Sequence, residues 1–506
     1  PMKGAKGGSK TTESWKDVDS IVTGALKDAR KVRIVSYPCT SDSTRRIMKE
    51  FMAGFADAKW LEVDPLGRDD VADGQDESYG GRIVPTYHFE HAEVVVSFGA
   101  DFLGSWGNEV ENSRDWAKGR KLFKKDDKLS KLFVYESNFS VTGANADERL
   151  AIIPGNELAA ALAVAYELMI NQKKGKFAES AEVKAIFTGQ TLDSLLGKAG
   201  GLDHAKVKAT AEALWEARGK SLIVGSGDAA LQVVINLLNS NLDNEGKTVD
   251  GNGDVSMGVS NIRQLAQLQA ELESGSVDVV IFHKVNPVYF LPNGEAFANA
   301  TKKCKAVISI NTHLDETNDM ADVVLAESHD LECWGDGRPR PSTYSLQQPT
   351  ISPIADTRSF EDILINWVRG GVKGSGLLAT TAANAKGNYY DYVKENWKQN
   401  VFPAFGKGQT LLDFWETALQ KGVVLGKEAP ARERAFKMSA LKSVQKAAGE
   451  LKSLTISKAK KGPAIEGSGI MLGTYASSMA DGQGANNAWL QELPDPMSTV
   501  TWDNYL

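Results

Sequence analysis

Short runs of consecutive apolar residues, each followed by a polar loop and an amphipathic stretch, recur along most of this chain. Such runs predict strands that are buried on both faces, as in a parallel sheet. Between them, apolar residues recur at helical spacing, for example at Ile47, Phe51 and Phe55. Strands that alternate with helices predict an α/β fold with largely parallel, doubly wound sheets. We expect strands at residues 32–36, 94–97, 133–136, 221–224, 277–282, 306–310 and 321–325.

These strands fall into two groups, which predicts two α/β domains, and the resemblance to a known family described below implies that one is inserted in the other. We expect residues 1–92 and 221–370 to form one discontinuous domain, in which strands 32–36 and 277–282 share a sheet. Residues 93–220 would then form the inserted domain.

The character of the chain changes after Arg369, where small residues become frequent. We expect residues 371–469 to form a helical and linker segment, with linkers at 370–376 and 379–387 and an exposed helix within the Lys-rich stretch 427–469. Residues 470–506 begin a new block, which we interpret as a return segment leading to a missing C-terminal domain.

The charge and hydropathy of the chain argue against a nucleic-acid partner and against a membrane-spanning segment. The net charge of −7 argues against nucleic acid, because phosphate binding needs clustered lysine and arginine. The most apolar run, residues 158–170, is too short to span a bilayer and contains Glu167. We therefore expect no nucleic-acid partner and no direct membrane span.

The cysteines and histidines do not form a metal-binding motif. An iron–sulfur cluster needs about four thiolates, and the three cysteines here are far apart. Histidines that follow strand ends of one domain can meet in space, but scattered structural histidines are the favoured interpretation. We expect no catalytic, cofactor-binding or metal-binding residue on this chain. The residues considered are Cys39, Cys304, Cys333, His88, His91, His204, His283, His313 and His329.

Two loops carry weak ligand-binding patterns. Gly225-Ser226-Gly227 follows a strand, as a phosphate-binding turn does, but the third glycine of the dinucleotide fingerprint is missing. We favour an ordinary strand-to-helix turn. Asp250, Asn252 and Asp254 alternate like calcium ligands, but Val255 and Asn261 stand where the turn glycine and the bidentate glutamate belong. We favour a solvated loop.

Four tryptophans lie beside glycine, asparagine or charged residues in expected loops. An aromatic side chain in such a loop is often an interface anchor, because its ring buries area while its N–H finds a partner. Packing within the domain is the alternative. We expect exposed anchors such as Trp106 and Trp334 to bury surface on a neighbouring subunit; the other two are Trp116 and Trp489.

Ordered motifs along nearly the whole chain resemble the molybdopterin oxidoreductases. They include NPVY at 286–289, DETNDMADVVL at 315–325, and WGD and DTRS at 334–336 and 356–359. The blocks VVSFGADFLGSWG (95–107) and ANNAWLQELPDP (485–496) narrow the resemblance to the molybdopterin-like B subunit of alternative complex III, a bacterial membrane quinol:electron-acceptor oxidoreductase. That family usually carries the domain without a working molybdenum site. The resemblance implies two doubly wound domains, one inserted in the other.

The departures from catalytic members concern the cofactor. Ala100-Asp101-Phe102 stands where those enzymes have Asn-Pro, and Glu136-Ser137-Asn138 where they have an Asp-Pro-Arg that reads a guanine of the cofactor. Residues 335–341 replace their glycine-rich Asn…Glu-Gly-Arg segment. The resemblance thus implies a cofactor-free chain that lacks the family's N- and C-terminal parts. Iron–sulfur clusters are expected on the missing C-terminal part or on a companion chain.

By resemblance, the chain is a non-catalytic scaffold in a respiratory or photosynthetic quinol:cytochrome c (or other acceptor) oxidoreductase. It would support an iron–sulfur module on the extracytoplasmic (periplasmic) face of the bacterial inner membrane. Expected partners are a multihaem cytochrome that carries haem c and a quinone-binding integral membrane subunit. The alternative is a fragment of an active molybdenum or tungsten bis-pterin oxidoreductase. A nicotinamide dehydrogenase fits the α/β pattern but lacks the fingerprint.

Overall fold

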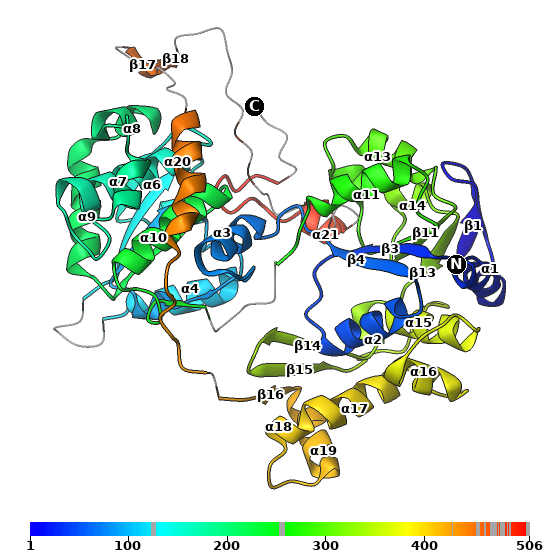
Figure 1. The fold of residues 1–506 in the computed structure, drawn as a ribbon. Helices are drawn as coiled ribbons and strands as arrows, with labels where there is room; N and C mark the ends of the chain where they lie inside the picture. The colour runs from blue at the N-terminus through cyan, green and yellow to red at the C-terminus, as the bar shows by residue number, and fades with distance from the viewer. Residues whose placement is uncertain are drawn as a thin grey trace. The chain divides into compact units, whose positions relative to one another are not determined.

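The chain folds into two compact units (Figure 1). Unit 1 comprises residues 1–67, 256–428 and 479–488, and unit 2 comprises residues 68–255, 429–478 and 489–506. The computed structural model describes residues 1–122, 128–251, 259–427, 429–451, 456–459, 462–465, 473, 475, 481–482, 484 and 487–501.

Unit 1 is built on a seven-stranded sheet in the order β2-β1-β13-β12-β11-β3-β4. The five strands from β13 to β4 are parallel, and the order grows outward in both directions from the central pair β3 and β11, as in a doubly wound sheet. Val32 pairs with Val279, which confirms that the first strand and the strand near 280 share a sheet. The strands are β1 (Met2–Gly4), β2 (Lys10–Thr12), β3 (Lys31–Ser36), β4 (Asp57–Glu62), β11 (Val279–His283), β12 (Ala306–Asn311) and β13 (Val323–Ala326).

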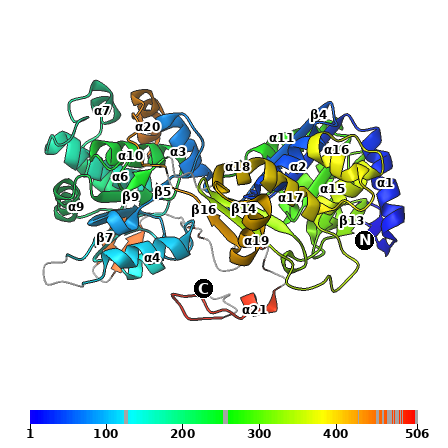
Figure 2. The ribbon, with the colours of Figure 1, turned by 90° about the horizontal axis from the view of Figure 1, so that it is seen from below.

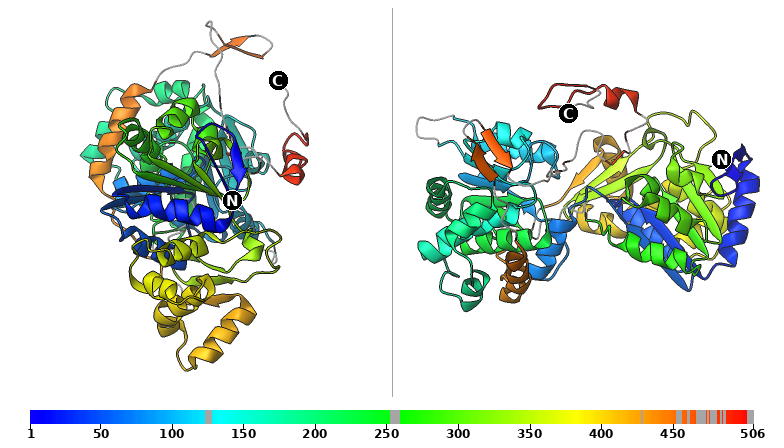
Figure 3. Two further views of the ribbon diagram at one scale, coloured as in Figure 1. Left: turned by 90° about the vertical axis from the view of Figure 1, so that its right-hand side faces the viewer. Right: turned by 90° about the horizontal axis from the view of Figure 1, so that it is seen from above.

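Alternate residues of these strands enter two separate cores, because successive side chains of a strand point to opposite faces. Ile34 and Ile281 belong to one cluster with α1, α2, α15, α17 and α19, whereas Val35 and Val280 belong to another with α11 and α13. Helices therefore cover both faces of the sheet. Helices α15, α16 and α17 lie side by side (Figure 2), and α1 is the blue helix near the N-terminus (Figure 3). The helices are α1 (Trp15–Lys27), α2 (Asp42–Met52), α11 (Gln264–Glu273), α12 (Pro287–Phe290), α13 (Gly294–Thr301), α14 (Glu316–Asp319), α15 (Phe360–Arg369), α16 (Gly376–Ala383), α17 (Tyr389–Asn400), α18 (Phe402–Phe405) and α19 (Leu411–Lys421).

A small three-stranded sheet completes unit 1. It consists of β14 (Gly335–Arg340), β15 (Thr343–Gln347) and β16 (Val423–Leu425), and the 3₁₀ turn η3 (Asp330–Glu332) precedes it.

Unit 2 is built on a parallel four-stranded sheet in the order β8-β7-β6-β9. Its core joins the strands to α6, α9 and α10, and α6 continues into a π-helical turn over Tyr166–Asn171. A two-stranded ladder of β5 and β10 lies apart from this sheet. The elements are α3 (Asp69–Tyr79), β5 (Thr86–Tyr87), η1 (Phe89–His91), β6 (Val94–Phe98), α4 (Glu109–Gly119), β7 (Lys131–Glu136), α5 (Val141–Ala144), β8 (Glu148–Ala151), α6 (Glu157–Ala165), α7 (Ala181–Ile186), α8 (Leu192–Lys198), α9 (His204–Glu216), β9 (Ser221–Gly225), α10 (Ala229–Asn241), β10 (Val249–Asp250), η4 (Met438–Ala440), α20 (Leu441–Glu450), the hairpin β17 (Ile456–Ala459) and β18 (Gly462–Ile465), and α21 (Ala488–Gln491).

The expected domain boundaries at 92/93 and 220/221 are wrong. Strand β9 pairs with β6, with Ile223 beside Val96, so residues 221–255 belong to the inserted unit. Helix α3 also belongs there, because Gln75 donates a buried hydrogen bond of 2.9 Å to Asn236 of α10. An apolar strand looks alike in either sheet, so its sequence does not reveal which sheet it joins.

The segment after residue 370 is more ordered than expected. Part of the expected linker 379–387 is the end of α16, whose Leu378 is fully buried, and residues through 427 pack into unit 1. Helix α20 buries Leu441 and Val444 in the core of unit 2, so it is not a wholly exposed helix. Much of the remainder of 452–480 lies outside the described residues. None of the helices in the described part of the chain combines the length and hydropathy of a membrane span.

Candidate functional site

Ligands of open α/β sheets bind beyond the carboxyl ends of the strands, where the strand order reverses. In unit 1 that position lies between β3 and β11, and in unit 2 it lies between β6 and β9. These two strand ends are therefore the candidate sites of the fold.

In unit 1 a carboxylate of the chain itself lies at the N-terminus of α2, the helix that follows β3. Helix α2 begins after β3, and Ser41 caps it by accepting a 2.9 Å hydrogen bond from the Thr44 N–H. The carboxylate of Asp336, from β14, accepts hydrogen bonds from the hydroxyls of Ser41 and Ser43 and a 2.8 Å bond from Trp397 Nε1. A helix N-terminus attracts phosphates and other anions. Here a side chain already occupies that position.

The basic groups at the end of β11 are already paired. His283 Nε2 lies 3.0 Å from Glu327 Oε2, and its ring stacks on Phe360 at 3.9 Å. Lys284 Nζ lies 3.2 Å from Glu327 and 3.0 Å from Asp330. Although burial acts to lower the pKa of Lys284, the two carboxylates raise it above its ordinary value. The Lys284 ammonium is therefore neutralised by acids of the same unit, and the His283 imidazole is already hydrogen-bonded to one of them.

Two further acids at this edge are buried enough to hold protons. Burial raises the pKa of Glu361 to about 7, although Thr44 Oγ1 donates a 2.6 Å hydrogen bond to it. Burial likewise raises the pKa of Asp315, near the end of β12, to about 6. Carboxyl groups in a dry environment resist ionisation, and a nearby anionic ligand would add to that resistance.

A pocket of about 500 Å³ lies beside these residues in unit 1. Its wall includes Ser328, Cys333, Trp334, Arg358, Asp362 and Tyr390. Burial raises the pKa of the Cys333 thiol to about 12, and it does the same for Cys39 at the end of β3. Both thiols are therefore protonated at neutral pH in the absence of a bound metal ion.

In unit 2 the glycine turn is likewise occupied by the chain. The N–H of Gly227 donates to Asp70 Oδ2 at 3.1 Å, and Gln232 Nε2 donates to the same oxygen at 2.8 Å. Asp228 caps α10 by accepting from the Leu231 N–H at 2.9 Å. The structure thus favours the ordinary strand-to-helix turn, because carboxylates take the donors that a phosphate would need.

The three histidines near strand ends of unit 1 do not meet. His313 Nδ1 contacts Thr312 Oγ1 at 3.0 Å, and His329 Nδ1 accepts the Leu331 N–H at 3.1 Å. No group of potential metal ligands within the described ranges includes them or His283. The scattered structural interpretation remains the prediction for these residues. Of the calcium-like loop, Asp250 is buried, whereas Asn252 and Asp254 lie outside the described residues.

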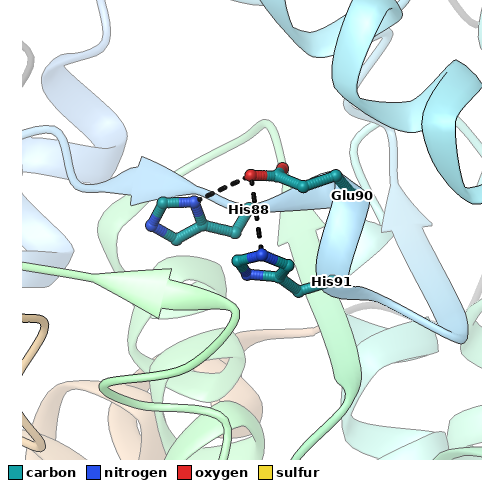
Figure 4. Close-up of side chains that lie close together, drawn as sticks. All are labelled: His88, Glu90 and His91. Atoms are coloured by element: carbon teal, nitrogen blue, oxygen red, sulfur yellow. Dashed lines mark hydrogen bonds and ion pairs between the residues drawn. The ribbon is translucent and has the colours of Figure 1, made fainter.

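Sequence reasoning missed one cluster and misplaced one tryptophan. His88, Glu90 and His91 come together (Figure 4). The signal was the H-x-E-H spacing of residues 88–91, where the two histidines were considered without Glu90. Trp106 is 5% exposed and lies under the Arg68 guanidinium at 3.4 Å, so the expectation of an exposed anchor is wrong.

The other tryptophans differ in exposure. Trp334 is half-buried against Tyr390, with ring centroids 4.6 Å apart, and Trp116 is also half-buried. Trp489 is 86% exposed. Of the four, only Trp489 presents most of its surface to solvent.

Comparison with known proteins shows which protein family matches the chain and which individual proteins are similar to it. A family model described as molybdopterin oxidoreductase matches residues 1–345. The menaquinone reductase, molybdopterin-binding-like subunit of Nitratidesulfovibrio vulgaris is 26% identical over 406 residues, which cover 74% of this chain and 57% of that protein. The chain thus spans little more than half the length of this curated relative. Acetylene hydratase from Pelobacter acetylenicus has a similar fold, with a TM-score of 0.61 at 13% identity over 84% of this chain and 66% of that one.

Proposed function

Since this chain belongs to the molybdopterin oxidoreductase family, we propose that it is a cofactor-free scaffold subunit of a quinone-linked, membrane-associated electron-transport complex. The name of the Nitratidesulfovibrio relative, a molybdopterin-binding-like subunit of a menaquinone reductase, supports the quinone link and the role as one subunit among several.

The observation that carries the cofactor-free part is the same in both units. Asp336 at α2 and Asp70 at the glycine turn each accept hydrogen bonds from groups that would otherwise face a phosphate. A pterin dinucleotide brings its own phosphates. Two unit charges about 4 Å apart repel by about 4 kcal/mol at the effective dielectric of a protein surface. The described residues at these strand ends therefore do not fit the cofactor.

The motifs that resemble alternative complex III refine the proposal. The chain would support an iron–sulfur module carried by a further part of the polypeptide or by a companion chain. Its other partners would be a multihaem cytochrome that carries haem c and a quinone-binding integral membrane subunit. The complex would transfer electrons from quinol to cytochrome c or another acceptor, with this subunit on the extracytoplasmic side of the membrane.

The cofactor-free proposal is tested by analysing the purified complex for molybdenum, tungsten and oxidised pterin. We expect both metals at far less than one atom per chain and no pterin fluorescence, with a catalytic family member treated in parallel as the positive control. Stoichiometric metal together with pterin would overturn the proposal. It would instead favour the alternative, a fragment of an active bis-pterin oxidoreductase.

The scaffold role is tested at an exposed aromatic residue. Trp489→Ala removes an indole that is 86% exposed, and interface tryptophans often contribute about 2 kcal/mol or more to binding. We expect partner subunits to dissociate about 30-fold more readily, quinol oxidation to fall in parallel, and the chain's own thermal unfolding to be unchanged. Val110→Ala, at a residue 77% exposed, is the matched control. Lost turnover in a fully assembled complex would show that the chain acts in the chemistry.

A further inference from the structure

The turn that follows β5 holds two imidazoles and a carboxylate on one side of the chain (Figure 4). The backbone of His88 is fixed because its amide N–H donates to the carbonyl oxygen of Thr248 at 2.9 Å. The 3₁₀ turn η1 closes because the backbone N–H of His91 donates to the carbonyl oxygen of His88 at 3.1 Å. Between them, Phe89 is fully buried and stacks on Phe102 at 4.4 Å. The backbone that carries the three side chains is therefore anchored to the core of unit 2.

The donor atoms converge on one oxygen. Glu90 Oε1 lies 3.3 Å from His88 Nδ1 and 3.9 Å from His91 Nε2, and the three ligand atoms all lie within 4.8 Å of one another. The two imidazole rings stack with centroids 5.3 Å apart. Ligands bound at about 2.1 Å around a tetrahedral ion lie about 3.4 Å apart. His91 Nε2 must therefore move closer to Glu90 Oε1, and the His91 side chain is 61% exposed and has room to rotate.

One oxygen of the Glu90 carboxylate has no hydrogen-bond partner among the described residues. This oxygen, Oε2, is buried. A buried carboxylate oxygen without a partner is costly, and a bound cation would remove that cost.

We propose that His88, Glu90 and His91 form a binding site for a divalent transition-metal ion, with zinc as the best fit. Two imidazole nitrogens and one carboxylate oxygen are a donor set that zinc accepts, and a water molecule would complete the tetrahedron on the exposed side of His91. The ion would clamp the end of β5 to the 3₁₀ turn. The site uses none of the strand-end residues considered for a pterin, so it stands apart from the proposed scaffold function.

The alternative is a metal-free His–Glu hydrogen bond, and zinc titration of the chelator-treated full chain distinguishes the two. We expect one zinc ion per chain, and we expect Co²⁺ in its place to give the intense visible absorption of tetrahedral coordination. His91→Ala and Glu90→Gln should each weaken zinc binding at least about 100-fold, since even outer-sphere changes cost 10- to 100-fold. Zinc should also raise the unfolding temperature of the wild type but not of either variant.

His204→Ala is the matched control, because His204 lies in the same unit, is 54% exposed and faces Glu167 at 3.4 Å. This control should bind zinc like the wild type. Unfolding of each metal-free variant at the wild-type temperature shows that the change has not disturbed the fold. Zinc that binds equally well to the wild type and to both site variants, or no binding in the wild type, would overturn the proposal.

Discussion

Replacing Asp336 tests whether a carboxylate of the chain substitutes for a bound anion at helix α2. Four donor groups of three residues converge on this side chain: the hydroxyls of Ser41 and Ser43, the Ser43 N–H and Trp397 Nε1. Ser43 is completely buried, and Trp397 is 1% exposed. Asp336→Ala removes the acceptor from all four donors, whereas Asp336→Asn retains one oxygen for them.

The expected magnitude follows from these contacts. A buried donor left unsatisfied costs about 1–3 kcal/mol, and an anion at a helix N-terminus contributes about 0.3–1 kcal/mol. Ser43 Oγ also accepts from Asn396 and Ser41 Oγ from Thr44 N, but those bonds use the oxygens as acceptors, so both O–H groups still lose the acceptor to which they donate. The two hydroxyls and the indole N–H of Trp397 therefore all contribute. We expect Asp336→Ala to destabilise unit 1 by roughly 3–5 kcal/mol and Asp336→Asn by about half as much.

Hydrogen exchange of the α2 amides is the suitable assay, because a protein of two units need not unfold in one step. Protection of α2 should fall in the order wild type, Asn variant, Ala variant. Sulfate should restore part of that protection in the Ala variant only, since the helix N-terminus is then open to an anion. Asp17→Ala, which removes a carboxylate from the first turn of α1 in the same unit, is the control and should change protection of its own helix by less than about 1 kcal/mol.

Two results would refute this reasoning. The first is α2 protection in Asp336→Ala that matches the wild type. The second is a sulfate effect of equal size in both proteins, which would mean that the ion acts through general salting rather than at the helix N-terminus.

The remaining predictions concern one buried ring and one buried acid. Trp106→Ala should destabilise unit 2 by about 3–5 kcal/mol, because it leaves a cavity and removes the ring that stacks on the buried Arg68. Urea unfolding of the variant chain without its partners measures this change. Unchanged stability would mean that Trp106 serves an interface after all. Burial raises the folded-state pKa of Glu361 from 4.5 to about 7, so the proton stabilises the fold below about pH 4.5 and that stability is lost as the pH rises through about 7. The loss amounts to about 3 kcal/mol, and Glu361→Gln should remove this dependence of stability on pH. Urea midpoints measured from pH 5 to pH 8 compare the wild type with the variant. Parallel curves would contradict the raised pKa of Glu361.

Much of the secondary structure was predictable from the order of residues. The apolar runs located β3, β6, β7, β9, β11, β12 and β13. The motifs from NPVY to DTRS indicated the family that the comparison then showed. These features are local, because period, propensity and motif spacing involve residues that are near one another in the chain.

The tertiary structure decided what the strand ends contain. Asp336 reaches Ser41 across 295 residues, and Asp70 reaches Gly227 across 157. No local pattern marks an aspartate as the partner of a distant helix N-terminus. For the same reason, the sequence did not show that Trp106 lies under Arg68.

The membership of β9 in the inserted unit was also a tertiary decision. A buried parallel strand is apolar on both faces, so its sequence fits the centre of either sheet, and the choice depends on the neighbours that pack around it. By contrast, the spacing of His88, Glu90 and His91 was visible in the sequence. Only the 3₁₀ turn showed that this spacing brings all three side chains together, because an extended strand would direct neighbouring side chains to opposite faces.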